Sequence, residues 1–440
     1  MQKITDSKKK YYKATMASLV SLSIPTVLEE ILATLLQYVD TAMVGHLGED
    51  ATAAVSATTT IGWLMHAIPG AFAVAMLALA ARANGAGDER LLKKIAGQAT
   101  ICAFSIGIVL EIAALALSPY IPIWMGVEED IVGPASMYFF ITSLTLVFRT
   151  SSRVFSAMVR SVKDTKSPMY VSICENILNV VLNYILIYEC NLGIFGAAVA
   201  SSISFCLGGL AMFILMLSKT GLRPGVGDLK LDRAIMAEAL SIGMPVLGTT
   251  VVSCLGYIVF AGMVSRMGTT VFAAHSIAIT AEQIVYIPGY GVRVATSSLI
   301  GNILGKGNLA RLRVTSRAAI FLTMAMMLVN GTLLYLFAHP FMQIFTNSAE
   351  VAELGGRMLK LVAFSEPFFG LMIVLEGISY GMGRTKHIFL CESASMWGVR
   401  ILMTFICINV WGLGLEAVWF CMIADNIAKS LLLYIFRPRV

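Results

Sequence analysis

Four side chains that can bind a cation or carry a proton lie within long apolar stretches of the sequence: Asp40, Asn179, Asn183 and Ser201. An ionisable group near the centre of a bilayer costs roughly 2.5–3.5 kcal/mol, so Asp40 needs a partner, water or a function there. Carboxylate, amide and hydroxyl oxygens are the ligands that hard cations prefer. These residue types predict a coupling site for Na+ or H+, with Asp40, Asn179 and Asn183 as candidate sodium ligands. Hydrogen bonds that only join neighbouring helices are the structural alternative.

Spacing places these side chains at a similar depth. Asn179 and Asn183 are four residues apart, so they lie on one face of a helix. That helix is expected to run outward and the next one, with Ser201, to begin outside. Asp40 stands about five residues before the outer end of its own helix. We therefore expect the four residues to meet in the outer half of one group of helices.

Five further acids in apolar stretches are candidates for substrate binding or accessory coupling: Glu29, Glu30, Glu282, Glu366 and Glu376. Glu282 and Glu376 have no evident cation within their own helices, so they could attract a cationic substrate. Arg400 is expected to pair with Glu366 or Asp425 in a structural role. Glu29 and Glu30 leave open the acid pair of an intramembrane enzyme.

Recognisable catalytic motifs are absent. The sequence contains no HExxH or CxxC motif, and its five histidines are dispersed. The segment GNILGKGN is one residue short of a phosphate-binding loop and lacks Ser or Thr after Lys306. Arg149, Arg153 and Arg160 have the spacing of a phosphate-binding stripe, but basic residues at the cytoplasmic end of a helix explain them too. We expect no enzyme and no cofactor besides the coupling ion.

The elements that must position these residues are transmembrane helices. Of 440 residues 58% are hydrophobic and only 13% charged, and the mean hydropathy is +0.80. A helix needs about 20 apolar residues to cross a bilayer. We predict an all-α polytopic membrane protein with twelve helices near residues 15–45, 52–82, 93–118, 131–160, 167–188, 194–218, 234–266, 270–304, 310–337, 350–383, 387–410 and 414–436.

The charge of the connections predicts the orientation. The amino-terminal tail and every second connection are rich in Lys and Arg, whereas the others are acidic or uncharged. The positive-inside rule then places both termini in the cytoplasm, in a multi-pass protein of the inner (cytoplasmic) membrane. Because this topology explains the net charge of +6, the charge does not indicate nucleic-acid binding. We expect a monomer in the lipid bilayer.

The helices fall into two related groups of six. At an offset of about 220 residues, Pro25 aligns with Pro245 and Gly48 with Gly268. We expect a tail at 1–14, a lobe at 15–218, a linker at 219–233, a second lobe at 234–436 and a tail at 437–440. Halves with an even helix number share one orientation and are related by an axis along the membrane normal. Two pseudo-symmetric lobes around a V-shaped central cavity suit alternating access.

The second half does not repeat the polar residues of the first. Phe260 stands opposite Asp40. Val399 and Met403 stand opposite the two asparagines at the same offset. Only the first half therefore carries the predicted coupling site.

The chain resembles the multidrug and toxic compound extrusion (MATE) transporter family. The segments that carry the resemblance are IP at Ile24, VDTAMVGHLG from Val39, NGAGD from Asn84, NVVLNYILI from Asn179, GAAVASS from Gly196, GMP from Gly243, EQIVYIPGYGV from Glu282 and GNILGKGN from Gly301. The resemblance implies two six-helix lobes and export of cationic or amphipathic compounds against inward Na+ or H+ flow.

The resemblance also implies roles for individual residues. The family's amino-lobe acid falls on Asp40, its fifth-helix asparagine on Asn179 and its sixth-helix hydroxyl on Ser201. Asn183 replaces a second aspartate of many relatives, which argues against a site of two carboxylates. Glu366 lies near the tenth-helix acid of others.

The expected function is therefore cation-coupled antiport of small organic, cationic compounds. A flippase for lipid-linked oligosaccharides or lipids, of related architecture, is the alternative. The acids within the helices outnumber Arg293 and Arg400, which argues against a cationic cavity for pyrophosphate. A passive channel also stays open.

Overall fold

The computed structural model describes residues 2–438, with side chains described from residue 12 onward except at 59, 60, 63 and 64. The chain is 88% helical, and the described residues form no strand. Eleven helices are long and apolar enough to cross a membrane, and a bent pair of helices makes a twelfth span. The predicted all-α polytopic class is confirmed.

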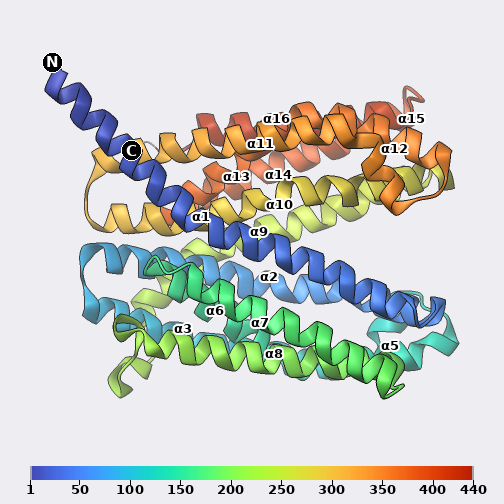
Figure 1. Cartoon of the computed structure of the whole chain (residues 1–440), viewed down its shortest axis with the longest axis horizontal. Helices are drawn as coiled ribbons and strands as arrows, with labels where there is room; N and C mark the ends of the chain where they lie inside the picture. Colours follow the sequence, from blue (N-terminus) through green and yellow to red (C-terminus); the bar gives the residue numbers. More distant parts are fainter. Residues whose placement is uncertain (1, 439–440) are drawn as a thin grey trace. The chain divides into compact units, whose positions relative to one another are not determined.

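The helices follow one another with short connections (Figure 1). Up to the linker they are α1 (Gln2–Gly45), α2 (Glu49–Ala86), α3 (Glu89–Leu117), α4 (Ile121–Trp124), α5 (Glu129–Ser143), α6 (Leu146–Ser161), α7 (Lys166–Asn183) with the π-helical η1 (Tyr184–Glu189), and α8 (Gly193–Ser218). The linker contains the 3-10 turns η2 (Thr220–Leu222) and η3 (Val226–Leu229). Beyond it come α9 (Arg233–Ser265), α10 (Thr269–Gly305), α11 (Leu309–Phe345), α12 (Ala349–Val362), the 3-10 turn η4 (Ala363–Ser365), α13 (Glu366–Gly381), α14 (Lys386–Ser395), the π-helical η5 (Met396–Ile401), α15 (Leu402–Asn409) and α16 (Leu415–Ile435).

Contacts divide the chain into two compact units. The first unit is Leu28–Gly243, and the second comprises the chain before Leu28 together with the chain from Met244 onward. Each division falls within three residues of one of the aligned prolines, Pro25 and Pro245. The beginnings of α1 and α9 therefore pack with the helices of the other sequence half. The lobe boundaries expected at 218 and 234 stay a prediction.

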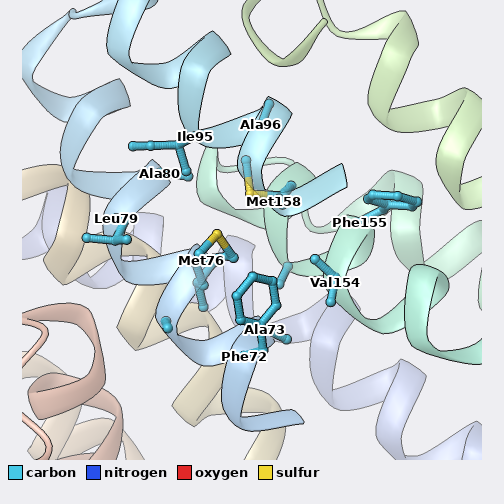
Figure 2. Packing of buried hydrophobic residues seen from close by; sticks show 14 of the residues in the cluster. Phe72, Ala73, Met76, Leu79, Ala80, Ile95, Ala96, Val154, Phe155 and Met158 are labelled. Atoms are coloured by element: carbon cyan, nitrogen blue, oxygen red, sulfur yellow. The ribbon is translucent and has the colours of Figure 1, made fainter. Parts of the chain in front are cut away.

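Small residues let the helices of the first unit approach closely. The helix α6 contacts α2, α3 and α8. Figure 2 shows Ala73 and Ala80 of α2 and Ala96 of α3 beside larger side chains such as Met76 and Phe155. Since lipid is as apolar as the side chains, such packing stabilises a membrane fold by dispersion contacts rather than by removal from water. In the second unit, α13 packs against α10, α11 and α16.

The fourth predicted helix, at 131–160, is wrong as a single element. It consists of α5 and α6, which meet at a bend of 46°. A break within the membrane frees backbone groups that need partners. The carboxylate of Glu111, on α3, accepts a hydrogen bond from the Val147 amide at 3.2 Å. This contact satisfies one group of the break, and the sequence gave no local signal of it.

Other spans are also less regular than predicted. The helix expected at 350–383 is α12, η4 and α13, and Pro367 in the first turn of α13 fits its restart. The helix expected at 387–410 contains the π-helical η5. The first helix begins at Gln2 rather than at 15, because no Gly or Pro interrupts the chain before Pro25.

The turns confirm the internal repeat in their backbone conformation. Gly48 and Gly268, aligned by sequence, precede helices with φ of 114° and 121°. Lys163 and Gly383, also 220 residues apart, have φ of 66° and 67°. Gly87 and its counterpart, a further glycine, share φ near 70° as well. The same turn geometry is therefore built twice.

A glycine-to-alanine change at Gly268 should destabilise the protein. Its φ of 121° and ψ of 158° belong to a region that only glycine occupies readily, at a cost of about 1–3 kcal/mol for other residues. We expect Gly268→Ala to lower the melting temperature in detergent. Gly262→Ala, in the helical interior of α9 where a Cβ meets open space, is the matched control and should not. Equal melting temperatures for the two variants would contradict this account.

The linker packs against the first unit. The Gln98 side chain, on α3, donates to the carbonyls of Asp228 (3.3 Å) and Lys230 (2.7 Å) and accepts from the Asp232 amide at 2.9 Å. Nearby, Lys219 pairs with Asp164 at 2.6 Å. These contacts fix the stretch that the sequence presents as a polar connection.

The Asp164 contacts make linker stability depend on pH. Partial burial alone would raise the pKa of Asp164, but hydrogen bonds from Lys219 and Ser167 outweigh it and hold the pKa below 3.8. The stabilisation is therefore present above about pH 4 and is lost as the pH falls through the lower, folded-state pKa. We expect the melting temperature to drop below pH 4 by an amount corresponding to less than about 1 kcal/mol, since the pair is partly exposed. Lys219→Met should flatten this drop, and an unchanged pH profile would contradict the assignment.

Candidate functional site

The four residues predicted to meet do so as one hydrogen-bonded chain across three helices. Asn183, at the end of α7, donates from Nδ2 to Oδ1 of Asp40 on α1 at 2.5 Å. It also donates to Oδ1 of Asn179 at 3.2 Å, and Asn179 donates from Nδ2 to the Ser201 hydroxyl on α8 at 3.2 Å. The structure therefore confirms the juxtaposition expected from spacing.

Local backbone structure places Asn183 at the centre of this chain. Asn183 is the last residue of α7, and the π-helical η1 begins directly after it. Single π-helical segments often occur at functional sites because they change the direction of the side chains around them. Asn183 is fully buried, whereas Asp40 and Asn179 are half-buried. Asp40 is thus the member that a solute can reach.

The donor set fits a hard cation. The Asn183 Oδ1 atom is buried and has no hydrogen-bond partner among the described residues. Both Asn183 N–H bonds are already donated, so the remaining oxygen of Asp40 and this amide oxygen are available as ligands. Within residues 2–438, no three His, Cys, Asp or Glu side chains are grouped as for a transition metal. Sodium or a proton, rather than a transition metal, suits such oxygens.

A cavity of about 550 Å³ adjoins this site between α1 and the α7–η1 segment. Val39, the neighbour of Asp40, lines it together with Met43, His46 and Tyr184. His46 stands at the end of the cavity near the α1–α2 turn. Space therefore extends from next to Asp40 toward that end of α1.

The first of the other acids, Glu29, is held in an ion pair. Its Oε1 lies 2.6 Å from the guanidinium of Arg160 on α6, and both side chains are largely buried. Glu30 is half-buried, and its backbone carbonyl accepts a hydrogen bond from Thr34. This geometry does not make a catalytic acid pair of Glu29 and Glu30. Sequence reasoning attributed Arg160 to topology alone and missed the pair, because no sequence spacing links α1 to α6.

Glu376 also has a partner that the sequence did not indicate. Arg293, on α10, lies 2.5 Å from its carboxylate. The Arg293 guanidinium also stacks over Tyr290 at 4.5 Å. The expectation that no cation stands near Glu376 is corrected, because its partner comes from another helix rather than from its own.

A buried ionic cluster lies where the second half lacks the polar residues of the first. Asp425, on α16, pairs with Arg400 of η5 at 2.8 Å and with Lys429 at 2.9 Å. It also accepts from the Ser395 hydroxyl at 2.6 Å. Of the two partners expected for Arg400, Asp425 is thus the correct one. Lys429 was missed, although its i, i+4 spacing from Asp425 is a readable signal.

Glu282 and Glu366 add negative charge to this region. Glu282 is 5% exposed and within electrostatic range of Arg400, and Glu366 is 1% exposed and near Glu282. Glu366 Oε2 has no hydrogen-bond partner among the described residues. Five acids of the second unit are buried: Glu282, Glu366, Glu376, Glu392 and Asp425. They outnumber the cations Arg293, Arg400 and Lys429, so two carboxyls need a proton or a bound cation.

This all-helical bundle, with an ion-binding chain in one half and a surplus of buried carboxyls in the other, has the features of a secondary membrane transporter. The family model MatE matches residues 25–185 and again residues 245–406, so its two matches begin 220 residues apart. The chain belongs to this family of transporters, which is not a family of enzymes.

Similar proteins agree over nearly the whole length. The chain is 27% identical to a probable multidrug resistance protein NorM of Thermotoga maritima, over 95% of this chain and 91% of that one. It is 24% identical to a probable multidrug resistance protein YoeA of Bacillus subtilis, over 97% and 94%. The fold matches a crystal structure of the Vibrio cholerae MATE transporter VcmN with a TM-score of 0.91, at 18% identity and 97% coverage of both chains. The homologues support a multidrug exporter.

Proposed function

We propose that the protein is a secondary active exporter, in which Na+ or H+ entering at Asp40 drives small cationic or amphipathic organic compounds outward by alternating access. The hydrogen-bonded chain from Asp40 through Asn183 and Asn179 to Ser201 carries this proposal. It is the place in the first unit where an accessible carboxylate meets unsatisfied amide oxygen. Asp40 would be the coupling carboxylate and the other three residues its ligands or supports.

The coupling follows from what binding does to the chain. Cation binding or protonation neutralises Asp40 and weakens its acceptance of the Asn183 N–H bond, because charged acceptors bind more strongly than neutral ones. The contact of α1 with α7 and α8 therefore depends on the ion. Ion-bound Asp40 would favour the outward-open form that releases substrate, and ion discharge to the cytoplasm would reset the protein. One charge crossing about 150 mV supplies roughly 3.5 kcal/mol, enough for a several-hundred-fold gradient of a neutral solute.

The substrate class and setting follow by the same reasoning. The relatives are named for multidrug resistance. The surplus of buried carboxyls suits a cationic compound, with Glu282 and Glu366 as accessory coupling or binding groups. The same surplus opposes a flippase that binds pyrophosphate. We place the protein in the inner membrane as a monomer with both termini cytoplasmic.

Efflux from liposomes tests the proposal. Vesicles containing the purified protein and a fluorescent cationic dye would receive a sodium gradient or a proton gradient separately. We expect one gradient to accelerate efflux and the other to have little effect. Glu49→Gln, an exposed acid at the start of α2, is a matched acid-to-amide control and should behave as the wild type. Efflux that ignores both gradients and follows only the dye gradient would indicate a passive channel.

A further inference from the structure

A groove of about 920 Å³ follows the surface of the second unit between α11, α13 and the end of α16. One end is basic, with Arg313 and Arg317 from α11 and Arg437 after α16. The other end is apolar, with exposed Phe321 and Leu328. The groove therefore has the polarity of an amphiphile with an anionic head.

Charge at the basic end is of one sign. No Asp or Glu occurs within α11, between residues 377 and 391, or after Asp425. These are the segments that border the groove at that end. The Arg437 guanidinium stacks 3.8 Å from the ring centroid of Tyr434, which also lines the groove. An anion is therefore the complementary ligand.

The length of the groove fits a lipid. Arg313 and Leu328 are fifteen residues apart on α11, about 22 Å along a helix at 1.5 Å per residue. One leaflet contributes about 15 Å of hydrocarbon, so a headgroup at the arginines would place its acyl chain beside Phe321 and Leu328. A free phosphate ion would use only the basic end. We propose that this groove binds an anionic phospholipid of the leaflet on the side of the carboxyl terminus.

Native mass spectrometry of the purified protein with equimolar phosphatidylglycerol and phosphatidylcholine tests this proposal. We expect the wild type to retain phosphatidylglycerol selectively. Arg317→Gln with Arg437→Gln should lower retention roughly thirty-fold, since each basic residue near an anionic lipid changes binding about fivefold. The matched control Arg90→Gln with Arg223→Gln removes the same charge at exposed positions outside the groove and should retain the lipid.

A second variant separates a lipid from a simple anion. Ala325→Trp fills the apolar part of the groove and leaves the arginines in place. We expect it to lower retention of long-chain phosphatidylglycerol, and we expect millimolar inorganic phosphate not to displace the lipid from the wild type. Equal retention of phosphatidylcholine, displacement by phosphate, or full retention by the double arginine variant would overturn the proposal. None of these outcomes depends on the transport activity.

Discussion

Replacing Asp425 with asparagine is expected to destabilise the protein by roughly 3–5 kcal/mol, the largest effect predicted for a single substitution here. The change leaves Arg400 and Lys429, each 4% exposed, without the carboxylate that both contact. Two buried cations without a counter-ion are costly in a membrane interior. Thermal or denaturant unfolding in detergent would measure the loss.

Glu366→Gln is the matched control for this prediction. It makes the same acid-to-amide change at an equally buried carboxyl that belongs to a surplus of negative charge. We expect Glu366→Gln to leave stability unchanged or to raise it. Adding Lys429→Met to Asp425→Asn should restore part of the lost stability, because one uncompensated cation is removed. If Asp425→Asn were as stable as Glu366→Gln, the ionic cluster would not have the structural role assigned to it.

Replacing Asp40 with asparagine should abolish ion-driven efflux and leave the fold intact. An amide oxygen at this position still accepts the Asn183 hydrogen bond, so the stability change should be below about 1 kcal/mol. The amide cannot be protonated or neutralise a bound cation, so dye efflux in either gradient should fall to the rate of protein-free vesicles. Gradient-driven efflux at the wild-type rate would remove Asp40 from the coupling site.

The sequence was sufficient for the coupling site because helical spacing and membrane depth restrict it strongly. Asn179 and Asn183 share a face by their spacing alone, and polar residues in apolar helices point inward to partners. The repeat was equally readable. Gly48 and Gly268 align because both turns need a positive φ that other residues rarely adopt.

Contacts between distant helices could not be predicted in this way. The partner of Glu29 is Arg160, 131 residues away, and that of Glu376 is Arg293, 83 residues away. The break between α5 and α6 depends on Glu111 of α3, which accepts a backbone hydrogen bond there. A single sequence contains periodicity within a helix, but it does not contain the packing that brings two helices together.

The reverse coupling experiment tests the central claim most directly. Liposomes without any ion gradient would receive an outward gradient of cationic dye, and uptake of Na+ or H+ into the vesicles would be recorded for the wild type and Asp40→Asn. Because coupling between two ligands is reciprocal, antiport predicts that dye leaving the wild-type vesicles drives one of these ions inward, and that Asp40→Asn moves none. Dye efflux from wild-type vesicles with no counter-movement of either ion would contradict the account.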